Sequence, residues 1–264
     1  MNDSHAIVWP HLADLPAFRA LIRAIEHRLL AEYQPFARPV LDVGAGDGHF
    51  ASVALGPRID VGIDLKFSDL QEARRRPVYR GVVCASATAM PLPSDCFGTV
   101  VSNCVIEHIP DLPATLAEMR RVLRPGGRLL VTVPTDRLEQ NLPIPGALRG
   151  LGLEAAAKAY TDWFRQIQVH YHLLSRAEWV ATFERAGFRV AHARGYMSAR
   201  ATRFFELGHY AGWDNLVARR LVGRWVVWRW RPRFVLLEHL LASFVCEPEH
   251  PDDSCLFLVA EKPD

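Results

Sequence analysis

The sequence has few cysteines, and none of them has the spacing of a zinc site. Among its 264 residues there are five cysteines, an odd number with no C-x-x-C pair. Zinc sites typically use the C-x-x-C spacing, and disulfide frameworks use an even number of cysteines. We therefore expect reduced, mostly buried thiols of the kind found in cytoplasmic proteins. They are Cys84, Cys96, Cys104, Cys246 and Cys255.

Long hydrophobic runs are also missing. The most apolar stretch, residues 234–245, is too short to cross a bilayer and contains Glu238 and His239. Residues 1–9 lack a basic segment followed by an apolar one, so we expect no secretory signal. These features predict a cytoplasmic location, with contact to a membrane surface as an open alternative.

A large net charge is the third missing feature. Lys and Arg number 31 against 29 Asp and Glu, which leaves a net charge of +2 and argues against nucleic-acid binding. Half of the residues are hydrophobic, so the chain can bury a sizeable core and is not disordered. Its length suits one α/β domain with insertions.

The most informative stretch is residues 40–50, VLDVGAGDGHF. Its first four residues predict a buried parallel strand, and Gly44, Gly46 and Gly48 predict a tight turn before a helix starting near His49. A dinucleotide-binding turn, G-x-G-x-x-G, would need its third glycine at His49. The spacing here is G-x-G-x-G instead.

Strand and helix patterns then alternate along the chain. Strands are predicted at 59–64, 79–85, 99–105, 128–134, 188–194 and 254–261, and helices at 14–33, 68–76, 112–123 and 176–186. Such alternation favours a mainly parallel sheet. Asp64 ends one predicted strand at the edge of the glycine turn. There it can accept both hydroxyls of a ribose, or it can simply begin the next helix.

Four signatures in this order resemble the class I S-adenosylmethionine (SAM) methyltransferases, specifically the type 11 group that includes ubiquinone-pathway relatives. They are LDVGAGDG at 41–48, GID at 62–64, AMPLP at 89–93, and the pair SNCVIEHI at 102–109 and LRPGGRLLVTVP at 123–134. The resemblance implies a Rossmann-like, doubly wound α/β sheet of seven strands in the order 3-2-1-4-5-7-6. Strand 7 would be antiparallel, and helical insertions would cap the sheet.

The resemblance also implies SAM as the cofactor and assigns residues to it. Asp42 would organise the glycine turn, Asp64 would hold the ribose, and Leu65 would lie against the adenine. Ser86 stands where the family usually has an aspartate that accepts from the adenine amino group. The full implied set is Asp42, Gly44, Ala45, Gly46, Asp64, Leu65, Ser86, Ala87, Asn103, Cys104 and His108.

The expected organisation divides the chain into a SAM-binding core and its covers. We predict a helical lid at 1–38, the core at 39–134, a cap insertion at 135–175, and a continuation of the core at 176–197. A helical insertion at 198–253 and the final strand at 254–264 complete it. The segments outside the core would shape the acceptor pocket.

Three histidines are candidates for catalysis, because an unionised acceptor needs a base and histidine titrates near neutral pH. His108 follows the fourth strand, and His170 and His172 lie in the cap insertion. Each could equally line the site or have only a structural role. A divalent metal held by these three and Glu107 is the less favoured alternative, and no metal is predicted.

The predicted function is SAM-dependent methyl transfer to a small-molecule or lipid-linked acceptor, with oxygen favoured over nitrogen or carbon. A protein or glycan acceptor, and a SAM-binding protein without transfer activity, remain as alternatives. The run RWVVWRWR at 224–231 has three readings: the packing of an insertion helix, contact with a membrane surface, or a homodimer contact or acceptor-pocket wall.

Overall fold

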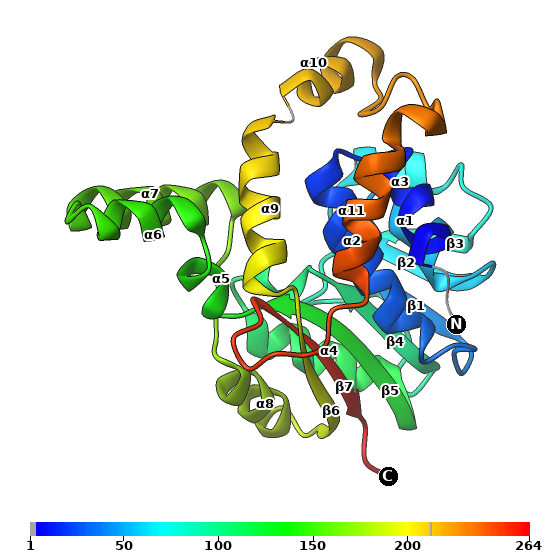
Figure 1. Cartoon of the computed structure of the whole chain (residues 1–264). Helices are drawn as coiled ribbons and strands as arrows, with labels where there is room; N and C mark the ends of the chain where they lie inside the picture. Colours follow the sequence, from blue (N-terminus) through cyan, green and yellow to red (C-terminus); the bar gives the residue numbers. More distant parts are fainter. Residues whose placement is uncertain (1–3, 212) are drawn as a thin grey trace. The chain divides into compact units, whose positions relative to one another are not determined.

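The computed structural model describes residues 4–211 and 213–264; residues 1–3 of the predicted lid and residue 212 of the predicted insertion lie outside this range. The chain forms two compact units. Unit 1 comprises Met1–Arg28, Arg137–Phe164 and Gly195–Ser254. Unit 2 comprises Leu29–Asp136, Arg165–Arg194 and Cys255–Asp264. Figure 1 labels the elements of both.

Unit 2 is built on a seven-stranded sheet with the order β3-β2-β1-β4-β5-β7-β6. Strands β1 to β5 pair in parallel in that arrangement, and β7 runs antiparallel to β5. This confirms the predicted doubly wound, Rossmann-like sheet. The strands are β1 Val40–Val43, β2 Ile59–Asp64, β3 Tyr79–Cys84, β4 Phe97–Asn103, β5 Leu123–Pro134, β6 Arg189–Tyr196 and β7 Cys255–Glu261.

Two helices of unit 2 start where the sequence supplies a side-chain cap. In α4 (Leu112–Val122) the Asp111 side chain accepts from the Ala114 amide. In α8 (Arg176–Arg185) Ser175 and Glu178 form a reciprocal capping box, as expected for the serine at that position. The remaining helical segments are η1 Ala51–Leu55, α3 Phe67–Ala73 and η2 Ile106–His108.

One boundary differs clearly from its prediction. Strand β5 begins at Leu123, five residues before the predicted start at Arg128. The Pro-Gly-Gly sequence at 125–127 signals a turn, but Leu123 still pairs with Phe97, and the register shifts before Thr99 pairs with Arg128. An irregular pairing of this kind has no sequence signature beyond the glycines.

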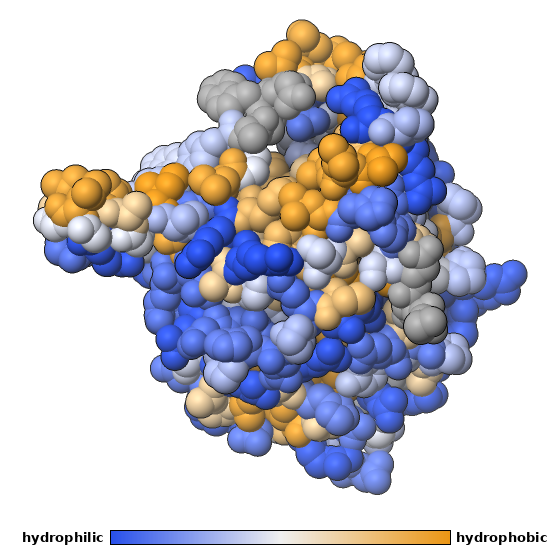
Figure 2. Space-filling model, viewed as in Figure 1, coloured by the Kyte–Doolittle hydropathy of each residue, from blue (hydrophilic) through white to orange (hydrophobic). Residues whose placement is uncertain are grey.

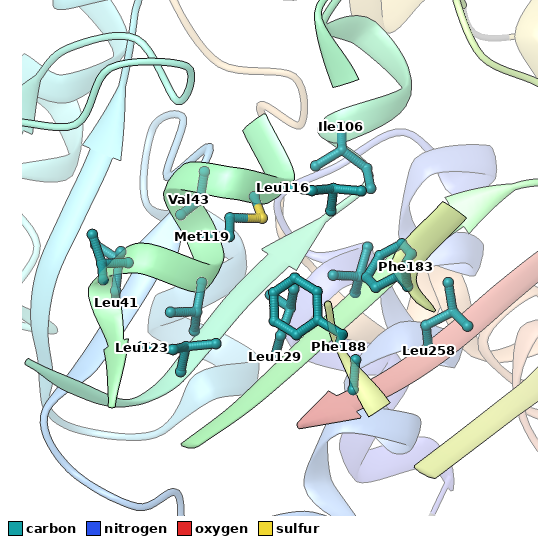
Figure 3. Close-up of a cluster of buried hydrophobic side chains, with 14 of the residues drawn as sticks. Leu41, Val43, Ile106, Leu116, Met119, Leu123, Leu129, Phe183, Phe188 and Leu258 are labelled. Atoms are coloured by element: carbon teal, nitrogen blue, oxygen red, sulfur yellow. The ribbon is translucent and has the colours of Figure 1, made fainter. Parts of the chain in front are cut away.

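The core of unit 2 lies between the sheet and the helices α4 and α8. Figure 3 shows Leu116 and Met119 of α4 and Phe183 of α8 beside Leu129 of β5 and Leu258 of β7. These side chains are fully buried. Their alternation along each strand and their helical spacing are the patterns from which the sheet was predicted.

Unit 1 is helical and is assembled from three separate stretches of chain. The predicted helix at 14–33 is α2, which begins at Ala17, and a further helix, α1, precedes it. The helices with residues in unit 1 are α1 Ser4–Leu12, α2 Ala17–Ala31, α5 Arg137–Gln140, α6 Pro143–Gly150, α7 Glu154–Gln168, α9 Ala199–Ala211, α10 Trp213–Val222, η3 Arg231–Phe234 and α11 Val235–Val245.

Buried carboxylates hold parts of unit 1 together. Glu26 accepts from Arg23 at 2.6 Å and from the Tyr196 hydroxyl at 3.0 Å. Glu238 binds the Arg231 guanidinium at 2.6 Å, which, more than any other group, keeps the pKa of this carboxyl below its usual value. A buried charge is costly unless it is paired, and each of these acids has its donors.

The five thiols form no disulfide within the described residues, but the expectation that most are buried is wrong. Cys255 is buried on β7, whereas Cys84 and Cys246 are exposed and Cys96 and Cys104 are half-buried. Cys84 lies on β3, an edge strand of the sheet, which leaves its side chain open to solvent.

A contact across three strands joins the start of β3 to β1, next to the glycine turn. The Tyr79 hydroxyl on β3 donates to the buried Asp42 carboxylate on β1 at 2.5 Å. The Tyr79 ring lies over Gly62 on the strand between them, where an added Cβ would come within 2.7 Å of the ring. Burial and the Asp42 charge both raise the pKa of Tyr79, so the hydroxyl keeps its proton.

Replacing Tyr79 by phenylalanine should therefore lower the free energy of unfolding by about 1–3 kcal/mol, because the buried Asp42 carboxylate loses a donor. Denaturant unfolding measures this change. Tyr171→Phe is the matched control, since the Tyr171 side chain is exposed. Equal effects of the two substitutions would contradict a role for the Asp42–Tyr79 bond.

Candidate functional site

The glycine turn after β1 has the predicted conformation. The amides of Gly44 and Ala45 both donate to the carbonyl of Ile63, at 2.8 and 3.0 Å, which ties the turn to the end of β2. Gly44 has a φ of +83°, and a Cβ there would lie 2.2 Å from Val105 Cγ2. Both the backbone angle and the space therefore require glycine at this position.

Gly46 is different, because it faces open space. Its φ is +52°, and apart from Gly46 and its two chain neighbours no atom of the described residues lies within 4 Å of the position that a Cβ would occupy. The backbone at Gly46 is thus free to be approached closely by a ligand.

Asp64 lies beside this open space at the end of β2. Its Oδ2 accepts from the Gly46 amide at 2.9 Å and its Oδ1 from the Lys66 amide at 2.8 Å. Each carboxylate oxygen accepts more than one hydrogen bond, so both can also take a ligand hydroxyl. The next residue, Leu65, is 73% exposed and offers an apolar surface adjacent to the carboxylate.

Ser86 and Ala87 occupy a turn after β3. The Ser86 hydroxyl is 2.7 Å from the Thr88 hydroxyl and accepts from the Thr88 amide at 3.2 Å. The hydroxyl that stands in place of the family's aspartate is thus already used in shaping its own turn. Ala87 packs against the core cluster of unit 2.

Asn103 and Cys104 end β4 in a constrained conformation. Cys104 has a φ of +51°, and its amide donates to the Thr132 carbonyl at 3.1 Å. Thr132 also donates from its hydroxyl to Asn103 Oδ1 at 2.8 Å. These bonds direct the chain from β4 into the segment that carries Glu107 and His108.

Glu107 and His108, which are neighbours in the sequence, come together with the distant His170. One ligand-type atom from each lies within 4.8 Å of the others. The Glu107 carboxylate is buried, and its Oε1 is 3.6 Å from His108 Nε2. The His108 and His170 rings stack with centroids 5.3 Å apart. Burial, followed by the nearby charges of His108 and Arg165, lowers the pKa of His170 to about 4.

Backbone contacts hold this cluster in place. His108 Nδ1 is 3.1 Å from the Val169 carbonyl. A carbonyl only accepts, so the proton is on Nδ1 and Nε2 carries the lone pair of the neutral ring. The Glu107 carbonyl accepts from the amides of Tyr171 and His172 at 2.9 and 3.2 Å.

His172 is outside this group. Its Nε2 is 3.0 Å from the Ile109 carbonyl and 3.3 Å from that of Pro110, and it donates to them. The three predicted catalytic histidines thus separate into two groups. His108 and His170 form a stacked pair, and His172 is hydrogen-bonded to the loop after η2.

Tyr79 is the residue of this site that sequence reasoning missed. Its only signal is Gly62, an isolated glycine within the β2 strand. Such a glycine often marks the close approach of another group. The register that brings the ring over Gly62 becomes visible only in the folded sheet.

Part of the chain matches a known protein family. Residues 41–131 match the family of methyltransferase domains. A malonyl-[acyl-carrier protein] O-methyltransferase from Halorhodospira halophila is 34% identical over 152 residues, which cover 54% of this chain and 50% of that protein. The chain thus spans about half the length of this relative.

Solved structures share the fold over almost the whole chain. A SAM-dependent methyltransferase from Thermotoga maritima superposes with a TM-score of 0.56 at 15% identity, covering 92% of this chain and 91% of that one. The [4+2]-cyclase SpnF superposes with the same TM-score of 0.56 at 18% identity, covering 91% and 81%. Identities this low establish the fold only.

The glycine turn, the acid at the end of β2 and the strand order agree with the match over residues 41–131. Residues 41–131 thus resemble a methyltransferase domain of the type 11 group, and the sheet has the strand order that this resemblance implies.

Proposed function

We propose that this protein binds SAM at the edge formed by β1, β2 and β4, and transfers its methyl group to an oxygen of a small-molecule or lipid-linked acceptor. The observation that carries the proposal is the open space at Gly46 beside the Asp64 carboxylate. The name of the Halorhodospira halophila relative, an O-methyltransferase, supports oxygen as the acceptor atom.

The residues at this edge fit SAM. Asp64 has two oxygens, each oriented by one backbone amide, for the two ribose hydroxyls. Exposed Leu65 would cover one face of the adenine, and the turn at Ser86 and Ala87 would border its edge. Gly44 to Gly46 would leave room for the methionine part to pass close to the backbone.

The chemistry needs alignment more than it needs a reactive side chain. Bound SAM supplies an electrophilic methyl group: its C–S bond breaks as the C–O bond forms, leaving S-adenosylhomocysteine. The protein therefore has to hold the acceptor oxygen in line and exclude water. A carboxylate acceptor carries no proton on the attacking oxygen, whereas a hydroxyl has to lose one.

His108 is placed to take that proton. The Val169 carbonyl fixes its tautomer with the lone pair on Nε2, and the Glu107 carboxylate, 3.6 Å away, would stabilise the ring once it is charged. His170 would support the orientation of the His108 ring by stacking on it. His172 would act through the loop it holds and not on the acceptor.

Two alternatives keep the same cofactor site: methyl transfer to a protein or glycan, and SAM binding without transfer. The SpnF likeness illustrates that this fold also occurs in a protein named as a cyclase. The acceptor is determined by residues outside the matched part of the chain.

The surface of residues 217–236 favours contact of this protein with an anionic membrane surface. Leu221, Trp228, Trp230 and Leu236 are between 53% and 87% exposed. Six arginines and no acidic residue lie between 217 and 236. Figure 2 shows apolar side chains over α10, at the start of this surface.

This composition has the features of an interfacial segment. Indole rings suit the boundary between headgroups and acyl chains, while arginines attract anionic lipids. Arg231 pairs with Glu238 and Arg229 with Asp14, which leaves Arg220, Arg224 and Arg233 as exposed cations of the same surface. Within the described residues, no helix is both long and apolar enough to span a bilayer.

Replacing Asp64 by alanine should weaken SAM binding by about 1–3 kcal/mol, because the ribose hydroxyls lose their acceptors. Calorimetric titration with SAM and S-adenosylhomocysteine measures it. Asp69→Ala is the matched control, since the contacts of that acid are with Lys66 and Ser68 and not with the glycine turn. A wild-type protein that binds neither ligand at millimolar concentration would overturn the cofactor assignment.

The acceptor class can be tested with a panel offered together with SAM. It should contain carboxylates as carrier-protein thioesters, free acids, hydroxylated small molecules, lipid-linked compounds, a protein and a glycan. We expect S-adenosylhomocysteine release and an O-methylated product with a carboxylate or hydroxyl compound. Methylation only at nitrogen or carbon would contradict the oxygen assignment, and transfer only to the protein or glycan would support that alternative.

Flotation with vesicles tests the membrane surface. The protein should bind vesicles that contain phosphatidylglycerol and not those of phosphatidylcholine alone. The double variant Trp228→Ala, Trp230→Ala should bind these vesicles roughly tenfold less, because it lacks the apolar area that the two indole rings would bury in the membrane. Trp163→Ala, also an exposed tryptophan, is the control. Failure of the wild-type protein to float would contradict membrane contact. Dimerisation of the wild-type protein that is lost only in the double variant would point to a second copy of the chain instead.

A further inference from the structure

We propose that Glu107, His108 and His170 form a binding site for one divalent first-row transition-metal ion. The three residues come from η2 and from the loop before α8 and converge within unit 2, with one ligand-type atom from each within 4.8 Å of the others. Two imidazoles and one carboxylate are a donor set suited to such ions.

The spacing of Glu107 and His108 supports shared coordination better than a direct hydrogen bond. The 3.6 Å between Glu107 Oε1 and His108 Nε2 is too long for a hydrogen bond. Two atoms that each lie about 2.1 Å from one tetrahedral ion are about 3.4 Å apart. The pair therefore needs to move little to bind the same ion.

The surroundings of the cluster provide a second, independent argument. A histidine ligand almost always donates its other ring N–H to a carbonyl or carboxylate, which fixes the ring. His108 does so through Nδ1 to the Val169 carbonyl at 3.1 Å. That carbonyl is presented by a residue with a φ of +56°, a conformation that is rare for a β-branched side chain. The backbone of Glu107 is held in turn by the amides of Tyr171 and His172.

The environment of the carboxylate also fits a cation. Glu107 is 1% exposed, so an ionised carboxylate there requires strong compensation. His172 does not belong to the group of ligand-type atoms that lie within 4.8 Å of one another, so the described residues provide three ligands here. Three protein ligands leave a coordination position open, as in catalytic rather than structural sites.

The open position gives the ion a role in the reaction, a step that rests on the proposed function. An acceptor hydroxyl or carboxylate would bind there, and a hydroxyl would release its proton to solvent more readily. A metal on Nε2 uses the lone pair that a general base needs. His108 would therefore accept the proton only in the metal-free protein, whereas in the metal-bound protein its Nε2 is a ligand and the proton goes to solvent.

The test begins with untagged, chelator-stripped full-length protein. Titration with Co²⁺ and Zn²⁺, followed by calorimetry and by the visible absorption of Co²⁺, should show one equivalent bound. The Co²⁺ spectrum should report a nitrogen and oxygen ligand set, and Mg²⁺ should bind far more weakly. Absence of a stoichiometric Co²⁺ or Zn²⁺ site in the folded wild-type protein would overturn the proposal.

Single substitutions assign the site to these residues. Glu107→Gln and His170→Ala should each weaken metal binding by at least about 100-fold, more than the loss of an outer partner. His192→Ala, an exposed histidine on β6, should bind as the wild type does. Circular dichroism checks that each variant is folded. If a variant does not fold, the titration of the wild-type protein still tests the proposal. Unchanged affinity in both folded ligand variants would show that the metal binds elsewhere.

The outcomes for the metal and for the proposed function are separable. SAM binding and methyl transfer are measured on the same stripped protein, with and without one equivalent of metal. A protein that binds metal at this site but not SAM would overturn the proposed function and leave the site. A stripped protein that binds SAM, transfers methyl groups and takes up no metal would overturn the metal site and leave the proposed function.

Discussion

The bond between the Tyr79 hydroxyl and the Asp42 carboxylate is the interaction on which the ligand-binding edge depends. It joins β3 to β1 over a strand where Gly62 leaves room for the ring. With these strands fixed, the amides of Gly44 and Ala45 reach the Ile63 carbonyl, and Asp64 reaches the Gly46 amide. A buried carboxylate with its donor in place thus sets the geometry of three strand ends.

Much of this fold could be predicted from the sequence, because alternating apolar strands and spaced apolar helices leave a periodic pattern. The strand order came from the resemblance of four motifs, not from periodicity. Contacts between distant residues were harder to foresee. His170 and His172 are two positions apart and look equivalent in sequence, but the backbone at Val169, with its φ of +56°, brings only the first against His108. Tyr79 was missed for the same reason, since its role depends on register.

The match to the family of methyltransferase domains covers residues 41–131, all of which lie in unit 2. The proposed cofactor site and the surface of residues 217–236 therefore lie in different parts of the chain. The first part uses backbone amides and one carboxylate, and such a site constrains only a few side chains. The second part carries the exposed tryptophans and arginines of residues 217–236, which have no counterpart in the cofactor motifs.

The segment composition of the two units has an evolutionary consequence. The chain passes from one unit to the other five times, at the boundaries after Arg28, Asp136, Phe164, Arg194 and Ser254. A recombination event that exchanged unit 1 for another would need correct joints at all of these places. Gene shuffling is therefore a poor route to variation in unit 1, and gradual substitution within the existing helices is the accessible one.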